Sequence, residues 1–315
     1  MILSITLNAA VDHILFINGL KPHDTNRVQT MQTDAGGKGI NLSRIAVELG
    51  AKSIATGFLG GGPGAFIKHV LDCQGVEHDF IETAEETRTN LNVESGDGPP
   101  TTFNAKGHHV TESEWSQLLE KVQPLLVQAD WVAMGGSLPP GVPTDAFRTL
   151  GRLAKEHNCK VMLDADGEPM QLGLECVPDL IKPNVREAER LLNRELVDKE
   201  DAICEAAKEL QAQLKNGGSH DPVVIISRGK KGAILADELG ILIGEGIEVQ
   251  SASTIGSGDS MLGGYLYALE TRLSREEALQ YGLAAGAATA ITDGTEIGRK
   301  PVILDLLARA VVRRM

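Results

Sequence analysis

The chain has 315 residues, of which 42% are hydrophobic and 23% are charged, the composition of a folded protein with a substantial core. Asp and Glu outnumber Lys and Arg by 43 to 30, which gives a formal net charge of −13. This acidity argues against nucleic acid and anionic membranes as partners, because both attract clustered cations. No apolar run reaches about 18 residues, so the sequence predicts no membrane span.

In chain order, short apolar runs predict strands at residues 2–7, 53–59, 131–134, 160–163, 180–182 and 223–227. A period of 3.6 residues predicts helices over 39–49 and 65–73. Capping-box signatures precede helices over 115–127 and 278–291, and Gly217 and Gly218 end a helix that begins near Lys199. Strands that alternate with helices predict an α/β fold in three layers, with a mostly parallel sheet covered on both faces.

Two stretches, 12–33 and 88–106, interrupt this alternation. The first has no helical pattern, and the second alternates polar with apolar residues before a turn at 96–100. Both predict a small β-sheet lid attached to the α/β body. No repeat, low-complexity tract or proline-rich linker divides the chain, so we expect a single domain over residues 1–315.

The cysteines are scattered along the chain and form no C-x-x-C pair: Cys73, Cys159, Cys176 and Cys204. Their spacing predicts neither a disulfide framework nor a zinc site, and reduced thiols are typical of a cytoplasmic protein. The pair His108 and His109 has no neighbouring ligand pattern, so we expect exposed or hydrogen-bonded histidines there.

Glycine clusters precede two predicted helices, at residues 34–41 and 253–260. Glycines at the start of a helix leave backbone N–H groups free to bind an anion. The Gly-Lys pairs are not followed by Ser or Thr, so no Walker A loop is present, and the missing G-x-G-x-x-G fingerprint disfavours a dinucleotide oxidoreductase. In the second cluster, the amides of Gly256, Ser257 and Gly258 could hold a transferring phosphoryl group. Asp259 could either accept a proton from an attacking hydroxyl or cap the helix.

Four short motifs follow one another along the chain: the glycine cluster at 34–41, Lys-Pro-Asn-Val-Arg-Glu at 182–187, a Ser-x-Gly-x-x-Gly turn at 227–232, and Thr-Ile-Gly-Ser-Gly-Asp at 254–259. In type and order they resemble the signatures of the ribokinase-type (PfkB family) sugar kinases, with Ser257 where that family usually has Ala. The resemblance covers essentially the whole chain. It implies an ATP-dependent kinase with a ribokinase-like fold and a β-lid over the sugar.

By this resemblance Asp259 is the catalytic base, which deprotonates the acceptor hydroxyl, and the amides of Gly256, Ser257 and Gly258 form the anion hole. Phosphoryl transfer depends mainly on positioning and charge neutralisation, which such groups supply. The resemblance assigns the sugar hydroxyls to Asp12, Gly37 and Asn41. It assigns Mg²⁺, held through water, to Asn184 and Glu187, and it assigns ATP to Lys182, Asn184, Ser227, Gly229, Gly232 and Thr254.

Further motifs at 8–12, 26–28, 87–90 and 136–141 resemble the branch of the family that phosphorylates sugar phosphates. Lys38, Arg88 and Arg27 could bind the phosphate already present, with Ser137 donating a hydroxyl, because cations suit phosphate. Ala9 stands where 1-phosphofructokinases usually carry Pro, whereas Lys38 resembles the 1-phosphofructokinase and tagatose-6-phosphate kinase pattern. The stretches 250–254 and 87–93 resemble the minor bacterial 6-phosphofructokinase more closely.

These conflicting subgroup signals rank fructose 6-phosphate, converted to fructose 1,6-bisphosphate, slightly ahead of fructose 1-phosphate and tagatose 6-phosphate. A neutral-sugar kinase and a nucleotide-binding regulator without catalysis remain as alternatives. The resemblance also implies a homodimer joined through the lids.

Overall fold

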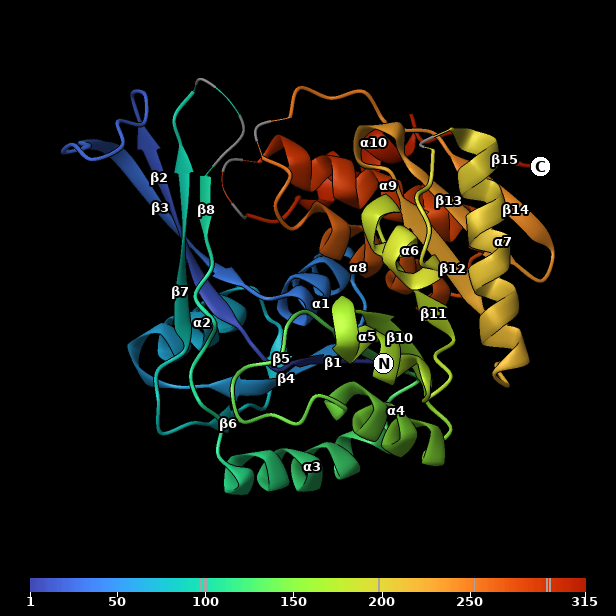
Figure 1. Cartoon of the computed structure of the whole chain (residues 1–315), viewed down its shortest axis with the longest axis horizontal. Helices are drawn as coiled ribbons and strands as arrows, with labels where there is room; N and C mark the ends of the chain where they lie inside the picture. Colours follow the sequence, from blue (N-terminus) through green and yellow to red (C-terminus); the bar gives the residue numbers. More distant parts are fainter. Residues whose placement is uncertain (97, 99–100, 198, 252, 293, 295) are drawn as a thin grey trace.

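Strands and helices alternate along the chain and build a main sheet and a smaller second sheet (Figure 1). The computed structural model describes every residue except 97, 99–100, 198, 252, 293 and 295. In this described part, the main sheet has the strand order β15-β14-β13-β12-β11-β10-β9-β1-β4-β5, with β6 paired to β4. Its strands are β1 (Ile2–Thr6), β4 (Ser53–Leu59), β5 (Glu77–His78), β6 (Ile81–Glu82), β9 (Trp131–Gly135), β10 (Lys160–Asp164), β11 (Leu180–Ile181), β12 (Val223–Ser227), β13 (Ala233–Asp237), β14 (Gly240–Gly244) and β15 (Val312–Arg314).

The centre of the main sheet is parallel, as the alternation of strands and helices predicts. Strands β4, β1, β9, β10, β11 and β12 are parallel neighbours, and β1 places Ile5 opposite Thr56 of β4 and Met134 of β9. Beyond β12, the strands β13, β14 and β15 continue the sheet in antiparallel pairs. All six predicted strands therefore form, and the antiparallel edge is an addition that the sequence analysis did not predict.

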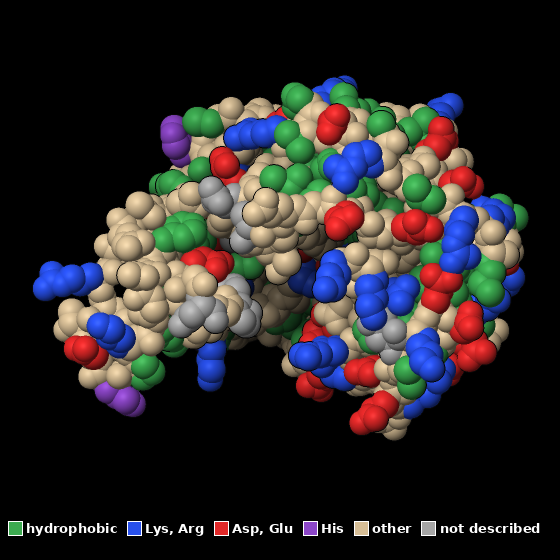
Figure 2. All heavy atoms as spheres, turned by 90° about the horizontal axis from the view of Figure 1, so that it is seen from above, with side chains coloured by type: hydrophobic (Ala, Val, Ile, Leu, Met, Phe, Trp, Pro, Cys, Tyr) green, Lys and Arg blue, Asp and Glu red, His purple; other side chains and the backbone are tan. Residues whose placement is uncertain are grey.

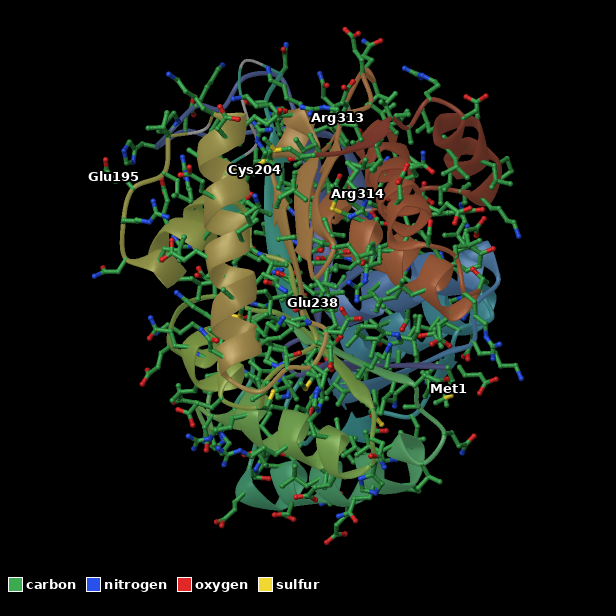
Figure 3. All side chains as sticks on the ribbon, turned by 90° about the vertical axis from the view of Figure 1, so that its right-hand side faces the viewer. Met1, Glu195, Cys204, Glu238, Arg313 and Arg314 are labelled. Atoms are coloured by element: carbon green, nitrogen blue, oxygen red, sulfur yellow. The ribbon has the colours of Figure 1, made fainter. Side chains whose placement is uncertain are left out.

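Helices cover both faces of this sheet. On one face lie α3 (Glu112–Leu126), α4 (Ala146–Glu156), α5 (Gly167–Leu174), α6 (Val185–Leu192) and α7 (Glu200–Asn216). On the other lie α1 (Lys38–Leu49), α2 (Gly61–Cys73), α8 (Ser257–Glu270) and α9 (Arg275–Ile291), with α10 (Lys300–Leu307) packed on α9. From the side where Arg313 and Arg314 are labelled, α7 and the C-terminal helices stand on opposite sides of the strands (Figure 3). The predicted three-layer fold is confirmed.

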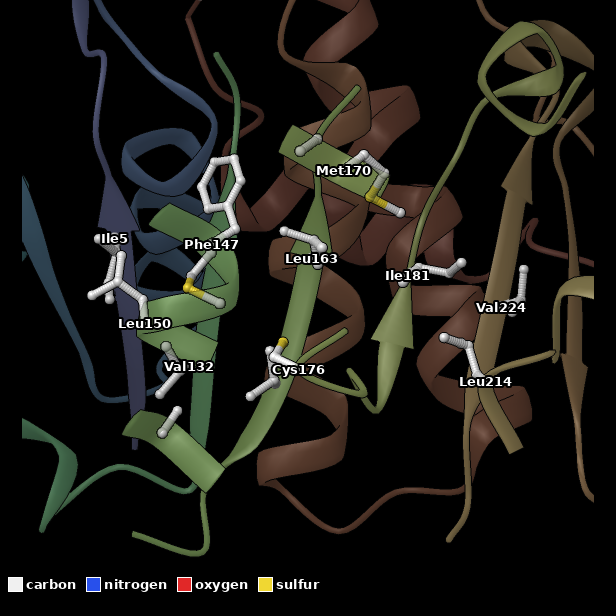
Figure 4. Packing of buried hydrophobic residues seen from close by; sticks show 14 of the residues in the cluster. Ile5, Val132, Phe147, Leu150, Leu163, Met170, Cys176, Ile181, Leu214 and Val224 are labelled. Atoms are coloured by element: carbon white, nitrogen blue, oxygen red, sulfur yellow. The ribbon is translucent and has the colours of Figure 1, made fainter. Parts of the chain in front are cut away.

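Two apolar cores separate these layers, because successive side chains of a strand point to opposite faces. Ile5 of β1 packs with Phe147 and Leu150 of α4 in the larger core, which Figure 4 shows in part. Ile2, three residues earlier in the same strand and so on its opposite face, belongs instead to the core beneath α1 and α8. Both strand faces are thus buried, which explains why the predicted strands appear in the sequence as continuous apolar runs.

The predicted helices form, but three of them begin earlier than expected: α2 at Gly61, α3 at Glu112 and α9 at Arg275. Both predicted capping boxes are present. The Thr111 hydroxyl accepts a hydrogen bond from the Glu114 amide at 3.2 Å, and the Glu114 carboxylate accepts one from the Thr111 amide, which completes a capping box. Ser274 and Glu277 make the same arrangement at α9. After α7, Gly218 adopts a φ of +111°, a conformation that favours glycine.

The smaller sheet has the order β3-β2-β7-β8, built from β2 (Ala10–Ile17), β3 (Val28–Gly36), β7 (Arg88–Glu94) and β8 (Thr101–Phe103). Its two outer pairs are antiparallel and the central pair, β2 with β7, is parallel. The predicted small sheet is therefore confirmed, although three residues of the turn expected at 96–100 (97, 99 and 100) lie outside the described residues. Met31 and Phe103 on this sheet are more than half exposed, at 58% and 56%. No helix in the described part of the chain is long and apolar enough to cross a bilayer.

Candidate active site

The candidate site lies where the parallel strands of the main sheet end, beside the base of the small sheet. Ligands commonly bind at this edge of open α/β sheets, because loops and helix N-termini converge there. A hollow separates the small sheet from the main body (Figure 2). A cleft of about 870 Å³ is lined by residues from both parts, among them Lys38, Arg88, Lys106, Ser137 and Glu187.

Asp259 lies in the first turn of α8, whose N-terminus carries the glycine turn. Gly256 precedes the helix with a φ of +76°, which favours glycine. The Asp259 Oδ2 atom accepts a hydrogen bond of 3.0 Å from Nδ2 of Asn41, on α1. Burial raises the pKa of Asp259, and Asp164 acts in the same direction, whereas Lys38 opposes this shift. A carboxylate with a raised pKa, near a helix N-terminus, has the properties of a general base.

Two lysines meet at a buried carboxylate beside this base. Asp164, the last residue of β10, pairs through Oδ1 with Nζ of Lys38 at 3.0 Å and through Oδ2 with Nζ of Lys182 at 3.4 Å. Burial raises the pKa of Asp164, but the two ammonium groups outweigh this effect and hold the pKa below its usual value. Burial opposes the charged form of Lys38, and Asp164 reverses that effect, so the Lys38 pKa is raised. Lys38 is therefore held as a cation.

The start of α8 also meets one of these cations. Nζ of Lys182 lies 3.3 Å from the position that a Cβ atom on Gly258 would occupy, so a larger residue at 258 would press on the ammonium group. In the same turn, the Ser257 hydroxyl oxygen is buried and has no hydrogen-bond partner among the described residues. Helix N–H groups, a buried cation and a free hydroxyl together form a site suited to an anion.

A second buried carboxylate stands at the base of the small sheet. Asp12 of β2 is 8% exposed, and its Oδ1 atom accepts a hydrogen bond of 2.8 Å from Nδ2 of Asn90, directly opposite on β7. Burial raises the pKa of Asp12, and the bond from Asn90 opposes this shift. Gly36 leaves room for this carboxylate, because a Cβ atom there would lie 2.3 Å from Oδ2 of Asp12. Gly37, with a φ of +129°, turns the chain from β3 into α1.

The guanidinium group of Arg88 joins two loops at the cleft. Nη1 donates to the carbonyl of Ala105 at 2.6 Å, and Nη2 donates to the carbonyl of Asn8 at 2.9 Å. The Asn8 amide donates to the Ser137 hydroxyl at 3.0 Å and to the Lys106 carbonyl at 2.9 Å. The predicted Arg88 and Ser137 thus share one cleft with Lys38.

Arg27 stands apart from these residues. It lies in the exposed loop between β2 and β3 and is not among the residues that line the cleft. The described chain therefore brings Lys38, Arg88 and Ser137 together and leaves Arg27 outside.

The elements assigned to ATP adjoin one another. The Asn184 side chain accepts a hydrogen bond from the Glu187 amide at 3.0 Å, and Glu187 accepts one from the Asn184 amide at 2.8 Å, so the two residues cap α6. Asn184 also forms an isolated parallel bridge with Ser227, at the end of β12. Gly229 and Gly232 both have positive φ values in the turn that follows, whereas Thr254 is exposed ahead of α8.

Sequence analysis missed Asp164 and Lys106. Asp164 had a readable signal, since it directly follows the predicted strand 160–163, and charged residues at the carboxyl ends of parallel strands often serve a site. Lys106 had none, because the loop after β8 has no periodic pattern. The expectation for His108 was wrong: its ring is buried, and neither ring nitrogen has a hydrogen-bond partner among the described residues. Its burial arises from the loop packing between β8 and α3, which the sequence does not reveal.

Comparison with known proteins agrees with the four motifs. The pfkB family carbohydrate kinase model matches residues 2–301. The 1-phosphofructokinase of Bacillus subtilis (strain 168) is 30% identical over 100% of both chains, and that of Escherichia coli (strain K12) is 34% identical over 97% of this chain and 96% of its own. The tetrameric inhibited form of phosphofructokinase-2 from Escherichia coli aligns with a TM-score of 0.84 and 28% identity, over 98% of each chain. The chain therefore belongs to the pfkB family of carbohydrate kinases and has the ribokinase-like fold that its motifs predict.

Proposed function

We propose that the protein transfers the γ-phosphate of ATP to a phosphorylated ketohexose, with Asp259 as the general base and fructose 1-phosphate as the first acceptor to test. The observation that carries this proposal is the position of Asp259. Its carboxylate lies at the N-terminus of α8, bonded to Asn41 and close to the paired cations Lys38 and Lys182. A base and an anion site thus occupy one helix turn.

In the proposed reaction, the acceptor hydroxyl gives its proton to Asp259 as its oxygen forms a bond to the γ-phosphorus of ATP. The bond from that phosphorus to the leaving oxygen of ADP breaks, so no other reactant is needed. The N–H groups of Gly256, Ser257 and Gly258 receive the negative charge on the transferring phosphoryl group. Asp12, Gly37 and Asn41 hold the sugar hydroxyls, and Lys182, Asn184, Ser227, Gly229, Gly232 and Thr254 hold the nucleotide.

Mg²⁺ fits the acidic side of the cleft. Glu187 lines both the main cleft and an adjoining cavity of about 260 Å³ that Asp166 and Glu168 also line. Mg²⁺ prefers oxygen ligands and keeps several of its waters, so carboxylate and amide oxygens can hold it through water. We assign Asn184 and Glu187 to this role. When bound, Mg²⁺ neutralises charge on the phosphate oxygens.

The cations on the other side of the cleft support a phosphorylated acceptor. Lys38, Arg88 and Lys106 line it together with Ser137. Lys38 is already paired with Asp164, so Arg88 and Lys106 supply the charge that a phosphate group would balance and that a neutral sugar would leave unmatched. Arg27 lies outside the cleft, so we assign it no contact with substrate from the same chain.

The choice between the two fructose phosphates depends on the relatives. In fructofuranose the C1 and C6 hydroxymethyl groups flank the ring, so either can face the base while the other carries the phosphate. The sequence ranks fructose 6-phosphate first, but relatives that are 30% and 34% identical over nearly the whole chain are named 1-phosphofructokinase. We therefore place fructose 1-phosphate first, and tagatose 6-phosphate remains an alternative.

We further propose a homodimer joined through the small sheets. Exposed Met31, Leu91 and Phe103 on that sheet would lose contact with water there, which stabilises an interface. A phosphofructokinase-2 that aligns over 98% of the chain is described as a tetramer. Sedimentation velocity on the purified chain tests this proposal, and a monomer at all concentrations would contradict it. The cytoplasmic location expected from the sequence stays a prediction.

ADP release with Mg²⁺ and ATP tests the acceptor, using fructose 1-phosphate, fructose 6-phosphate, tagatose 6-phosphate and free fructose. We expect kcat/KM for one phosphate to exceed that for free fructose by at least about tenfold, equivalent to about 1.4 kcal/mol. Equal activity on free fructose would overturn the role given to the cleft cations.

Replacement of the base provides the second test. Asp259→Asn should lower kcat by roughly 10²–10⁴-fold, the usual contribution of a general base. The matched control is Asp201→Asn, which changes an exposed acid in the first turn of α7 and should leave kcat unchanged. Normal turnover by Asp259→Asn would refute the proposed base.

A further inference from the structure

A buried arginine lies directly behind the proposed catalytic groups. Arg44 on α1 is 2% exposed. Its Nε atom donates to Oε1 of Gln74 at 2.8 Å, and its Nη1 atom donates to the carbonyl of Ala35 at 3.0 Å and to Oδ1 of Asn41 at 3.3 Å. These bonds connect α1 with the end of α2 and with β3. The last of them places the guanidinium group, which is always a donor, against the oxygen of the Asn41 amide.

The two neighbours of Asn41 require the same orientation of its amide. A guanidinium group can only donate hydrogen bonds, so the oxygen of Asn41 must face Arg44. An ionised carboxylate can only accept, so the nitrogen of Asn41 must face Asp259, which it does at 3.0 Å. This nitrogen is also 3.5 Å from the position that a Cβ atom on Gly256 would occupy, beside the glycine turn. The Asn41 amide nitrogen therefore borders the glycine turn that we propose to hold the transferring phosphoryl group.

We propose that Arg44 is a positioning residue that fixes the Asn41 amide, so that its N–H groups face Asp259 and the acceptor hydroxyl. Without Arg44, the amide can turn by 180° and place its oxygen against the Asp259 carboxylate. That rotation removes a donor from the base and sets two acceptors against each other. The inference rests on the proposed role of Asp259.

Arg44 acts on Asp259 through the Asn41 amide and not through its charge. Burial lowers the pKa of Arg44 to about 10, which leaves the guanidinium charged at neutral pH. The charged groups that face Arg44 are Asp34, Glu296 and Arg299. Those that face Asp259 are a different set: Lys38 on α1, Asp164 on β10, Lys182 after β11 and Asp12 on β2. Asn41, which bonds to both Arg44 and Asp259, is the direct connection between the two sets.

The test compares a substitution of Arg44 itself with a substitution of Gln74, which accepts one of its hydrogen bonds. Arg44→Met should lower kcat by roughly 10–100-fold, the range expected for a lost hydrogen bond to a charged group, with the KM for ATP unchanged. It should also move the acid limb of the kcat pH profile to higher pH, because loss of N–H donation raises the pKa of the base. The control Gln74→Met removes the bond to Nε, and should lower stability while kcat and the acid limb stay unchanged.

A double-mutant cycle separates positioning from general loss of structure. In an Asn41→Ala background, Arg44→Met should cause no further fall in kcat, because the amide that Arg44 holds is gone. Additive losses would overturn this inference but leave Asp259 as the base, whereas normal activity of Asp259→Asn would refute the proposed function itself. If circular dichroism shows that Arg44→Met does not fold, Arg44→Gln enters the same cycle, since its shorter side chain cannot reach Asn41. Unchanged kcat in Arg44→Gln would equally overturn the inference.

Discussion

The buried carboxylate of Asp164 gives the most quantitative prediction of stability. Asp164 is 2% exposed and pairs with two lysines that differ in burial, since the Lys182 side chain is 6% exposed and that of Lys38 is 34% exposed. Asp164→Asn keeps the shape of the side chain and removes its charge. Lys38 can turn toward water, so its pair adds little, but the ammonium of Lys182 remains buried without a counter-charge. Removing one partner of such a buried pair costs about 3–5 kcal/mol.

Urea unfolding followed by tryptophan fluorescence measures this loss. Trp131 on β9 and Trp115 on α3 are both buried, so their fluorescence reports on unfolding of the core around the main sheet. The matched control is Glu209→Gln, which breaks an ion pair with Arg194 in which both side chains are 46% exposed. That exposed pair should contribute about 0–1 kcal/mol. An Asp164→Asn protein within about 1 kcal/mol of wild type at pH 7 would refute the argument from burial.

The lowered pKa of Asp164 in the wild-type protein predicts how the stability difference from Asp164→Asn depends on pH. A carboxyl group whose pKa is lower in the folded state stabilises the fold fully above its unfolded pKa, about 3.9. That stabilisation disappears as the pH falls through the folded value. The difference in the free energy of unfolding between wild type and Asp164→Asn should therefore stay constant from neutral pH to about pH 5. It should narrow only below about pH 4. A difference that disappears near pH 6 would contradict the assignment of this effect to Asp164.

Two further predictions concern the small sheet and the loop that follows it. Gly36→Ala should displace Asp12, because the new Cβ atom would lie 2.3 Å from its carboxylate oxygen. As a result, kcat/KM for the sugar phosphate should fall roughly 100-fold with the KM for ATP unchanged. The control in the same assay is Gly62→Ala, whose new Cβ atom would meet no atom within 4 Å. Burial lowers the pKa of His108, so the unfolded chain takes up a proton that the folded chain resists, and stability should fall as the pH drops below about 6.5. His108→Leu should reduce that fall between pH 7.5 and 5.5 in urea titrations, whereas the exposed His109→Gln should not, and an unchanged pH dependence in His108→Leu would contradict the cause given.

Much of the fold could be predicted because the buried parallel strands are apolar on both faces. The runs at 53–59 and 223–227 match β4 and β12 at both ends. Strands β13 and β14 were missed because they follow one another through a short turn, without the intervening helix that marks a parallel sheet. Strands β5 and β6 have two residues each, which is too short for any period to be visible.

The site was predicted unevenly for a related physical reason. Glycine turns at helix N-termini have local signatures, so Gly37, Gly256 and Asp259 could be found from sequence. The pairing of Asp164 with Lys38 and Lys182 depends on which strands become neighbours, and no local pattern encodes that order. Arg27 lies within a matching motif but on an exposed loop outside the cleft of its own chain, so its contact with the phosphate stays a prediction.

The parallel pairing of β2 with β7 has a mechanical consequence. Asp12 and Asn90 sit opposite each other across this pair, and Arg88 begins β7, so the small sheet carries at its root two residues that we propose to bind the acceptor, Asp12 and Arg88. Asp259 belongs to α8, which is anchored in the main core. The residues proposed for the acceptor and the proposed base therefore belong to two different structural units, the small sheet and the main core. A tilt of the small sheet would change their separation, so we expect substitutions at its distant tip to alter turnover without touching a reacting group.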